Sequence, residues 1–322
     1  MSASLTSTKH RILQHGPLLP SLEAQLAHDF DLHRLTDEAD PQAYLRAHGG
    51  EFIGLVASAA IGVDAALVDA LPALRVISSF GVGFDKLDSS RTVPRGIAVG
   101  HTPDVLNDCV ADLAFALMLD VARGVSAAER FVRRGDWLTG RAPLGTRVSG
   151  KRLGIVGLGR IGRAIAKRAV GFDMEVAYSG RSQVDGVPYA FEPSLTALAE
   201  WADFLVVAVA GGVATRHLVS RDVLTALGPK GFLVNVARGT VNDEAALVEA
   251  LVQRRIAGAG LDVFENEPQV PQALMALDNV VLLPHIASGT HETRQAMADL
   301  VLTNLHSFFD KGRLQCAVPW PL

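Results

Sequence analysis

A glycine-rich turn constrains the fold of this 322-residue chain more than any other feature. The apolar run Leu153–Val156 leads directly into it, and the helical pattern IGRAIAKRAV follows. In such a strand–turn–helix unit the first glycine permits a tight turn, the second lets the backbone approach a pyrophosphate, and the third lets the helix lie close on the strand. Free N–H groups at the helix start attract the phosphates. The sequence therefore predicts a dinucleotide site at Gly157, Leu158, Gly159, Arg160, Ile161 and Gly162.

Short apolar runs alternate with helical patterns along the rest of the chain, which indicates parallel strands joined by crossover helices. After residue 150 the expected strands are RLGIVGLG, MEVAYS, DFLVVAVA, FLVNVA, GAGLDV and NVVLLPH. The first hundred residues predict a smaller unit, with strands near 11–14, 52–57, 76–79 and 97–100 and helices over 20–27 and 64–70. A long helical stretch is expected over 105–134, broken around Gly124, and a final helix over 292–309. The fold class is thus α/β, with two doubly wound parallel sheets.

The composition bounds the partners of the chain. A net charge of -4, with scattered Lys and Arg, gives no reason to expect nucleic acid or an anionic membrane, and a small substrate fits better. Two cysteines, Cys109 and Cys316, form no disulfide framework, which favours a cytoplasmic location. The first residues lack the apolar core of a signal peptide, and runs such as FLVVAVAGGV are too short to span a membrane. No metal site is expected.

The end of the next strand after the glycine turn bears on the choice of cofactor. An enzyme selective for NAD usually carries Asp or Glu there, which binds the ribose hydroxyls and repels a 2'-phosphate. This chain instead has Ser179, Gly180, Arg181 and Ser182. A guanidinium with hydroxyl donors beside it suits a phosphate monoester. The hypothesis is that NADPH is preferred over NADH; the alternative is that Arg181 is simply a solvated surface residue.

Three ionisable residues follow successive apolar runs later in the chain: Arg238, Glu267 and His285. The carboxyl ends of strands in an open parallel sheet line the crevice where ligands bind, so all three are expected to face one cleft. An isolated arginine or histidine in such a place is more often structural. Their occurrence at successive strand ends favours a catalytic site.

These segments carry a resemblance to a known family. GLGRIG, NVARG, GLDVFENEP and LLPHIAS, in this order, resemble the signature motifs of the D-2-hydroxyacid dehydrogenases. ISSFGVGFDKLD, VGHTPDVLNDCVADLA and LPALRVIS are similar to segments of that family's substrate domain, so the match covers nearly the whole chain. The ending SGRS resembles the glyoxylate and hydroxypyruvate reductases that use NADPH.

The resemblance implies a role for each residue of the site. His285 would be the general acid, Glu267 would orient it, and Arg238 would hold the carboxylate and carbonyl oxygen of a 2-keto acid. Glu267 is chosen over Glu265 because the family's glutamate directly precedes proline. Backbone N–H groups of Val82 and Gly83 would complete the carboxylate site. Further cofactor contacts are expected at Thr215, Val236, Ala237 and Asp262; the segment 210–215 differs from the Pro-Leu-Thr of many relatives.

The family architecture implies a substrate domain of residues 1–100, similar to flavodoxin and completed by 290–322, with a Rossmann domain of residues 101–289 inserted into it. The helical arm from about Val105 to Trp137 resembles the segment through which relatives form homodimers. In some relatives a tryptophan of this arm reaches the partner's substrate pocket, and Trp137 is the candidate here. Ordinary interface packing is the alternative.

The resulting prediction is a reductase of short 2-keto acids, with glyoxylate and hydroxypyruvate as substrates and NADPH as hydride donor; D products are implied by the resemblance alone. A bulkier substrate of the hydroxyphenylpyruvate type stays open, because the pocket cannot be sized from the sequence. Phosphoglycerate and formate dehydrogenases are competing activities within the family. A nucleotide-sensing scaffold without turnover is the alternative from another class, and measured turnover separates the two.

Overall fold

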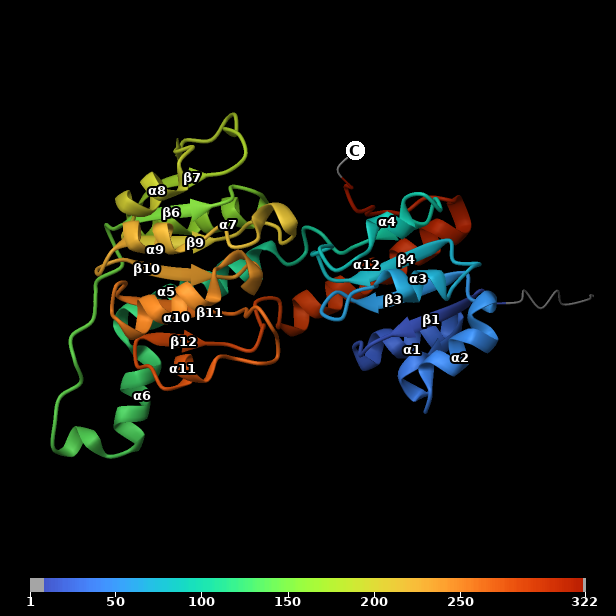
Figure 1. Cartoon of the computed structure of the whole chain (residues 1–322), viewed down its shortest axis with the longest axis horizontal. Helices are drawn as coiled ribbons and strands as arrows, with labels where there is room; N and C mark the ends of the chain where they lie inside the picture. Colours follow the sequence, from blue (N-terminus) through green and yellow to red (C-terminus); the bar gives the residue numbers. More distant parts are fainter. Residues whose placement is uncertain (1–8, 321–322) are drawn as a thin grey trace, which may run out of the picture. The chain divides into compact units, whose positions relative to one another are not determined.

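The computed structural model describes residues 9–320, which form two compact units. Unit 1 is the chain up to Val105 together with the residues from Thr290 onward, and unit 2 is Leu106–Gly289. In each unit, helices cover the faces of one sheet (Figure 1). The predicted α/β class with two parallel sheets is confirmed.

The sheet of unit 1 is parallel throughout, with the strand order β2-β1-β3-β4-β5 that is typical of flavodoxin-like folds. Its strands are β1 (Arg11–His15), β2 (Asp31–Arg34), β3 (Gly54–Ser58), β4 (Val76–Phe80) and β5 (Ala98–Gly100). Its helices are α1 (Pro20–Asp29), α2 (Pro41–His48), α3 (Ala65–Asp69), α4 (Ser89–Thr92) and α12 (His291–Lys311). The last helix packs on α1 and β4, and Ser78 Oγ donates a hydrogen bond to the carbonyl of Val301 at 3.1 Å.

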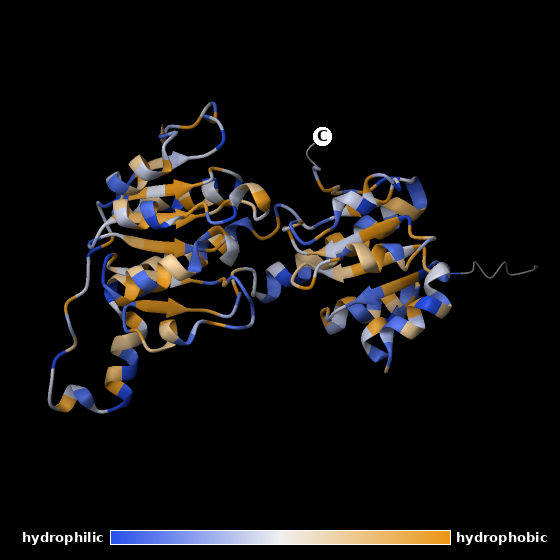
Figure 2. Cartoon of the chain, viewed as in Figure 1, coloured by the Kyte–Doolittle hydropathy of each residue, from blue (hydrophilic) through white to orange (hydrophobic). Residues whose placement is uncertain are grey.

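The strands of both sheets are rich in hydrophobic residues (Figure 2). This pattern is expected for parallel sheets whose two faces are both covered by helices. In β4, β9, β10 and β11 every residue is buried, and in β6 every residue except Arg152 is buried. The cores of the two units therefore lie between each sheet and its helices.

Elements for which the sequence analysis gives no residue range include β2, β8 (Ala190–Phe191) and α2. β2 reads DLHR and is an edge strand with no buried residue, so it lacks the apolar run by which the other strands are recognised. β8, at the other sheet's edge, has only two residues. α2 buries only Leu45, although Asp40 caps it by accepting a hydrogen bond from the N–H of Ala43.

Unit 2 contains all six strands predicted after residue 150. They are β6 (Arg152–Val156), β7 (Glu175–Ser179), β9 (Phe204–Val207), β10 (Phe232–Asn235), β11 (Gly258–Leu261) and β12 (Val280–Leu282). With β8 they form a parallel sheet in the order β12-β11-β10-β9-β6-β7-β8. The strand order reverses between β6 and β9, the switch point at which dinucleotides bind in this architecture.

Helices cover both faces of this sheet. α5 (Asn107–Arg123) and α7 (Arg160–Ala169) pack together on one face, and α8 (Leu195–Trp201), α9 (Arg221–Leu227) and α10 (Glu244–Val252) lie on the other (Figure 1). The short α11 (Gln272–Met275) contacts α10 and β12. Among residues 9–320, no helix combines the length and apolar content that crossing a membrane requires.

The long helical stretch predicted over 105–134 is divided in two. α5 ends at Gly124, whose φ of 63° lies in the left-handed region that glycine adopts without penalty, and α6 (Val125–Arg133) starts after it. α5 has seven buried residues, whereas α6 has none. From α6 the chain runs away from the body of unit 2 and returns at β6 (Figure 1).

Candidate active site

The glycine turn between β6 and α7 has the geometry that phosphate binding requires. Gly157 has a φ of 94°, and a Cβ on Gly162 would lie 2.1 Å from the carbonyl oxygen of Gly157. A Cβ on Gly159 would meet no atom within 4 Å, so the space beside it is open. No side chain caps the start of α7. N–H groups at the start of a helix attract anions, and the open space beside Gly159 leaves room for the pyrophosphate of a dinucleotide.

The Ser179–Ser182 segment lies beside this turn. Ser179 ends β7 and is buried, and its carbonyl oxygen accepts a hydrogen bond from the N–H of Gly157 at 2.8 Å. Gly180, Arg181 and Ser182 are exposed. Arg181 makes no hydrogen bond or ion pair with the described part of the chain, so its guanidinium is available to an anion. This is the position that the sequence analysis assigns to a 2'-phosphate.

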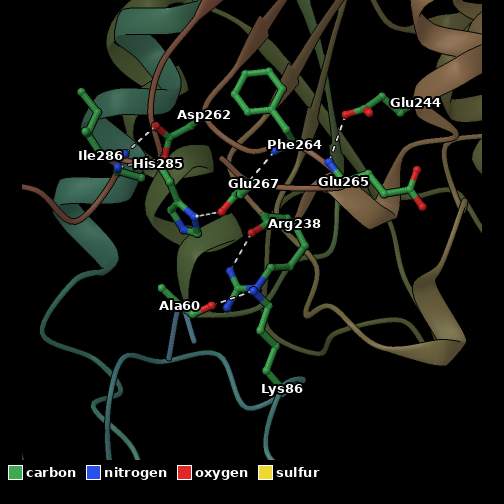
Figure 3. Close-up of polar contacts among 12 residues, drawn as sticks. Ala60, Lys86, Arg238, Glu244, Asp262, Phe264, Glu265, Glu267, His285 and Ile286 are labelled. Carbon is green, nitrogen blue, oxygen red and sulfur yellow. Dashed lines mark hydrogen bonds and ion pairs between the residues drawn. The ribbon is translucent and has the colours of Figure 1, made fainter. Parts of the chain in front are cut away.

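His285 and Glu267 come together at the carboxyl edge of the same sheet (Figure 3). The Nδ1 atom of His285 lies 2.8 Å from Oε2 of Glu267, while Oε1 of Glu267 accepts a hydrogen bond from the N–H of Phe264 at 3.0 Å. Both oxygens of the carboxylate are thus engaged, which fixes the plane of the carboxylate and, through it, the imidazole. His285 has a φ of 54°, in the left-handed region that costs a non-glycine residue energy.

Asp262 holds the loop that carries His285 (Figure 3). It is fully buried, and its two carboxylate oxygens accept hydrogen bonds from the N–H groups of Ile286 at 2.7 Å and Ala287 at 2.9 Å. Its carbonyl oxygen accepts a third, from the N–H of His285. Burial raises the pKa of Asp262, and the two backbone hydrogen bonds act against this rise. The contact with a nicotinamide carboxamide stays a prediction for this residue.

Arg238 follows β10 and is organised by Asn235, a residue that the sequence analysis does not single out. Asn235 is fully buried; its Oδ1 accepts a hydrogen bond from the N–H of Ala237, and its Nδ2 donates one to the carbonyl of Arg238 at 3.0 Å. The Arg238 guanidinium donates to the carbonyl of Ala237 at 2.7 Å. Val236 and Ala237 are buried. A lone asparagine at the end of an apolar strand was the available signal.

Glu265 has different partners from Glu267. Its carboxylate accepts a hydrogen bond from Arg216 and lies 3.3 Å from Nε2 of His217, and its N–H donates to Glu244 at 3.0 Å (Figure 3). The geometry therefore pairs His285 with Glu267 and leaves Glu265 to tie two loops together. These are the loop after β9, where the Thr215 hydroxyl donates to the carbonyl of Ala210 at 2.7 Å, and the loop after β11.

Val82 and Gly83 belong to unit 1, in the turn after β4. The carbonyl oxygen of Val82 accepts a hydrogen bond from Nδ1 of His101 at 3.0 Å, and that of Gly81 accepts one from the N–H of Thr102 at 2.9 Å. The N–H groups of Val82 and Gly83 donate no hydrogen bond within the described residues. Two successive half-buried donors without a partner suit a carboxylate.

Comparison with known proteins shows the family to which this chain belongs. The model of the D-isomer specific 2-hydroxyacid dehydrogenase NAD-binding domain matches residues 115–287. The chain belongs to the D-isomer-specific 2-hydroxyacid dehydrogenase family. It is 47% identical to hydroxyphenylpyruvate reductase of Plectranthus scutellarioides and 46% identical to glyoxylate/hydroxypyruvate reductase A HPR2 of Arabidopsis thaliana, over 92% of this chain and 95% of each relative.

A solved structure of the family matches the fold closely. The NADPH-dependent glyoxylate/hydroxypyruvate reductase of Sinorhizobium meliloti, in complex with NADP and malonate, shares 44% identity, with a TM-score of 0.92 over 97% of both chains. The 2-hydroxyacid dehydrogenase resemblance read from the motifs is thereby confirmed. The protein is an NAD(P)-dependent oxidoreductase of this family. Within residues 9–320, no cluster of three or more His, Cys, Asp or Glu side chains could hold a metal ion.

Proposed function

We propose that this 2-hydroxyacid dehydrogenase reduces short 2-keto acids, glyoxylate and hydroxypyruvate above all, to D-2-hydroxy acids with NADPH. The observation that carries the proposal is the His285–Glu267 pair, held at 2.8 Å on the sheet edge that also bears the glycine turn and Arg238. Relatives with 44–47% identity that are named for the reduction of hydroxypyruvate, glyoxylate or hydroxyphenylpyruvate support it.

The proposed reaction transfers one hydride and one proton. Bound NADPH would supply the hydride, which forms the new C–H bond at C2 of the keto acid and leaves NADP⁺. Because Nδ1 of His285 is engaged by Glu267, Nε2 is the atom that gives its proton to the carbonyl oxygen. The carboxylate of Glu267 keeps the ring in this orientation and balances the charge of the imidazolium before the proton leaves.

The substrate carboxylate needs fixed donors. We assign it to the guanidinium of Arg238, whose planar fork matches two oxygen atoms, and to the N–H groups of Val82 and Gly83. The fully buried side chain of Asn235 holds the backbone from which Arg238 projects. A lysine in place of Arg238 would lack the second parallel donor.

Removal of the His285 side chain tests its proposed role as the general acid. We expect His285→Ala to lower kcat about 100-fold or more with glyoxylate and NADPH, because a general acid contributes at least this much. The matched control is His48→Ala, which removes another histidine whose Nδ1 lies 2.9 Å from a glutamate, Glu51, on the surface of unit 1. The control should keep the wild-type kcat. A near-wild-type kcat for His285→Ala would overturn the assignment, and wild-type protein with no turnover of any 2-keto acid would favour the scaffold alternative.

NADPH preference is proposed from Arg181, which is exposed, without a partner in the described chain and beside the glycine turn. We expect kcat/KM of the wild type to be higher with NADPH than with NADH. Arg181→Ala should lower kcat/KM with NADPH about tenfold, because one charge-assisted hydrogen bond to the 2'-phosphate is lost. It should leave kcat/KM with NADH within about twofold of the wild type. Arg46→Ala, an exposed arginine of α2, serves as the control. Equal effects of Arg181→Ala on both cofactors would contradict the proposal.

A bulkier keto acid is the second candidate substrate, favoured by the 47% identity to a hydroxyphenylpyruvate reductase. A panel of glyoxylate, hydroxypyruvate and 4-hydroxyphenylpyruvate, each followed by NADPH oxidation, separates the two candidates. The highest kcat/KM for the aromatic acid would replace the short-chain assignment. We further propose a homodimer and, from the two cysteines, a cytoplasmic location.

A further inference from the structure

A buried histidine outside the proposed catalytic pair contacts the turn that carries Val82 and Gly83. His101 follows β5 and is only 4% exposed. Its Nδ1 lies 3.0 Å from the carbonyl oxygen of Val82. A carbonyl oxygen can only accept a hydrogen bond, so Nδ1 carries the hydrogen and donates it.

This hydrogen bond sets the direction of a neighbouring donor. The carbonyl of Val82 and the N–H of Gly83 belong to one planar peptide group and point to opposite sides of it. With the carbonyl held towards His101, the N–H of Gly83 is directed away from the imidazole. That N–H and the N–H of Val82 donate to nothing in the described chain.

Two further contacts hold the same turn from within unit 1. The N–H of Thr102, next to His101, donates to the carbonyl of Gly81 at 2.9 Å. The ring of Phe84 stands edge-on to His101, with centroids 5.9 Å apart, and edge-on to Trp320 at 5.7 Å. The backbone of His101 is anchored independently of its ring, because its N–H donates to Cys316 and its carbonyl accepts from Asn304. A change of the side chain therefore leaves these anchors in place.

We propose that His101 is a positioning residue for the substrate carboxylate. By fixing the Val82–Gly83 peptide, it aims the N–H of Gly83 at the carboxylate of the 2-keto acid, so that binding does not have to orient the turn. The proposal rests on the proposed function, in which this turn binds the carboxylate. In this role His101 acts through the turn and not by contact with the reacting atoms.

Two substitutions at this position carry the same amide donor but place it differently. Asn places its amide nitrogen where Nδ1 of histidine lies, and Gln places its amide one bond further, near Nε2. We expect His101→Gln to raise KM for glyoxylate about tenfold, since the carboxylate loses a preoriented hydrogen bond. kcat at saturation and KM for NADPH should stay within about twofold of wild type. His101→Asn should keep KM for glyoxylate within about threefold, although it too removes the ring beside Phe84.

The experiment compares steady-state kinetics of wild type, His101→Asn and His101→Gln, with thermal unfolding to confirm that both variants are folded. Equal KM values for the two variants, or a wild-type KM for His101→Gln, would overturn the role of Nδ1. If His101→Gln does not fold, His101→Asn decides alone: a tenfold rise in its KM would contradict the proposal, and a wild-type KM would support it. Absence of turnover in the wild type would instead remove the proposed function, and this inference with it.

Discussion

Asp262 is fully buried, and both of its carboxylate oxygens accept hydrogen bonds from the backbone of the loop that carries His285. Asparagine offers one acceptor and one donor at the same place, so in Asp262→Asn one backbone N–H would face an N–H₂ group. A buried donor without a partner costs about 1–3 kcal/mol. The residue that sequence analysis assigned to the cofactor thus also builds the loop of the proposed acid.

The raised pKa of Asp262 gives this substitution a pH dependence. Burial favours the protonated carboxyl in the folded state, so its contribution to stability is fully present below the ordinary value near 3.8 and is lost as pH rises through the raised pKa. The difference in the free energy of unfolding between wild type and Asp262→Asn should therefore shrink from pH 3 towards pH 7, as measured by urea denaturation.

Asp203 supplies a control of opposite sign. Burial raises its pKa, but hydrogen bonds from the side chain and N–H of Arg152 outweigh burial, and the pKa is lowered. Its contribution is present above the ordinary value and is lost as pH falls through the lowered pKa. The difference in the free energy of unfolding between wild type and Asp203→Asn should therefore grow with rising pH. If these free-energy differences changed in the same direction for both variants, the opposite pKa shifts of Asp262 and Asp203 would be contradicted.

At the scale of elements, the strands and helices that could be predicted are those with a long apolar run or a clear stripe. All six strands of unit 2 outside its edge strand β8 were found this way. β2 was missed because it is an edge strand with no buried residue, so its sequence DLHR lacks the apolar run that marks the other strands. The same limit applies to the site: Arg238, Glu267 and His285 follow apolar strands, but the contacts of Glu265 and His101 depend on residues far away in the sequence. Periodicity carries no signal for such contacts.

The strand–turn–helix element permits a matched pair of substitutions. A Cβ on Gly162 would lie 2.1 Å from the carbonyl oxygen of Gly157, so Gly162→Ala forces α7 off β6, and we expect it to cost about 1–3 kcal/mol of stability. Gly159 has a φ of -75° and open space beside it, so Gly159→Ala should change stability by no more than about 0.5 kcal/mol. It should nevertheless weaken NADPH binding, because the methyl group occupies the space assigned to the pyrophosphate.

Chemical denaturation and cofactor titration together check this pair. Gly162→Ala should lower the denaturation midpoint, whereas Gly159→Ala should keep the midpoint and raise the Kd for NADPH about tenfold or more. A Gly159→Ala protein that binds NADPH like the wild type would show that the pyrophosphate does not approach this turn.

At the scale of the whole molecule, residues 124–145 form an arm on unit 2. The arm is closed at its base, where the N–H of Thr146 donates to the carbonyl of Ala122 at 2.7 Å. Its apolar side chains are exposed, with Trp137 at 69% and Leu138 at 90%. The others are Val125, Val132 and Leu144. Several large apolar side chains on one segment without buried residues mark an interaction surface, and a second copy of this chain is the partner that the family resemblance implies.

We therefore expect the wild type to sediment as a dimer at micromolar concentration, and Leu138→Asp to sediment as a monomer, because a dimer would bury the new charge twice without a counter-ion. Val252→Asp, which changes an exposed valine at the end of α10, should stay dimeric. Trp137→Ala separates packing from a role in the partner's site: a raised KM for the keto acid in an intact dimer indicates contact with substrate, and an unchanged KM indicates packing alone. A monomeric wild type, or a dimeric Leu138→Asp, would assign the exposed arm to another partner.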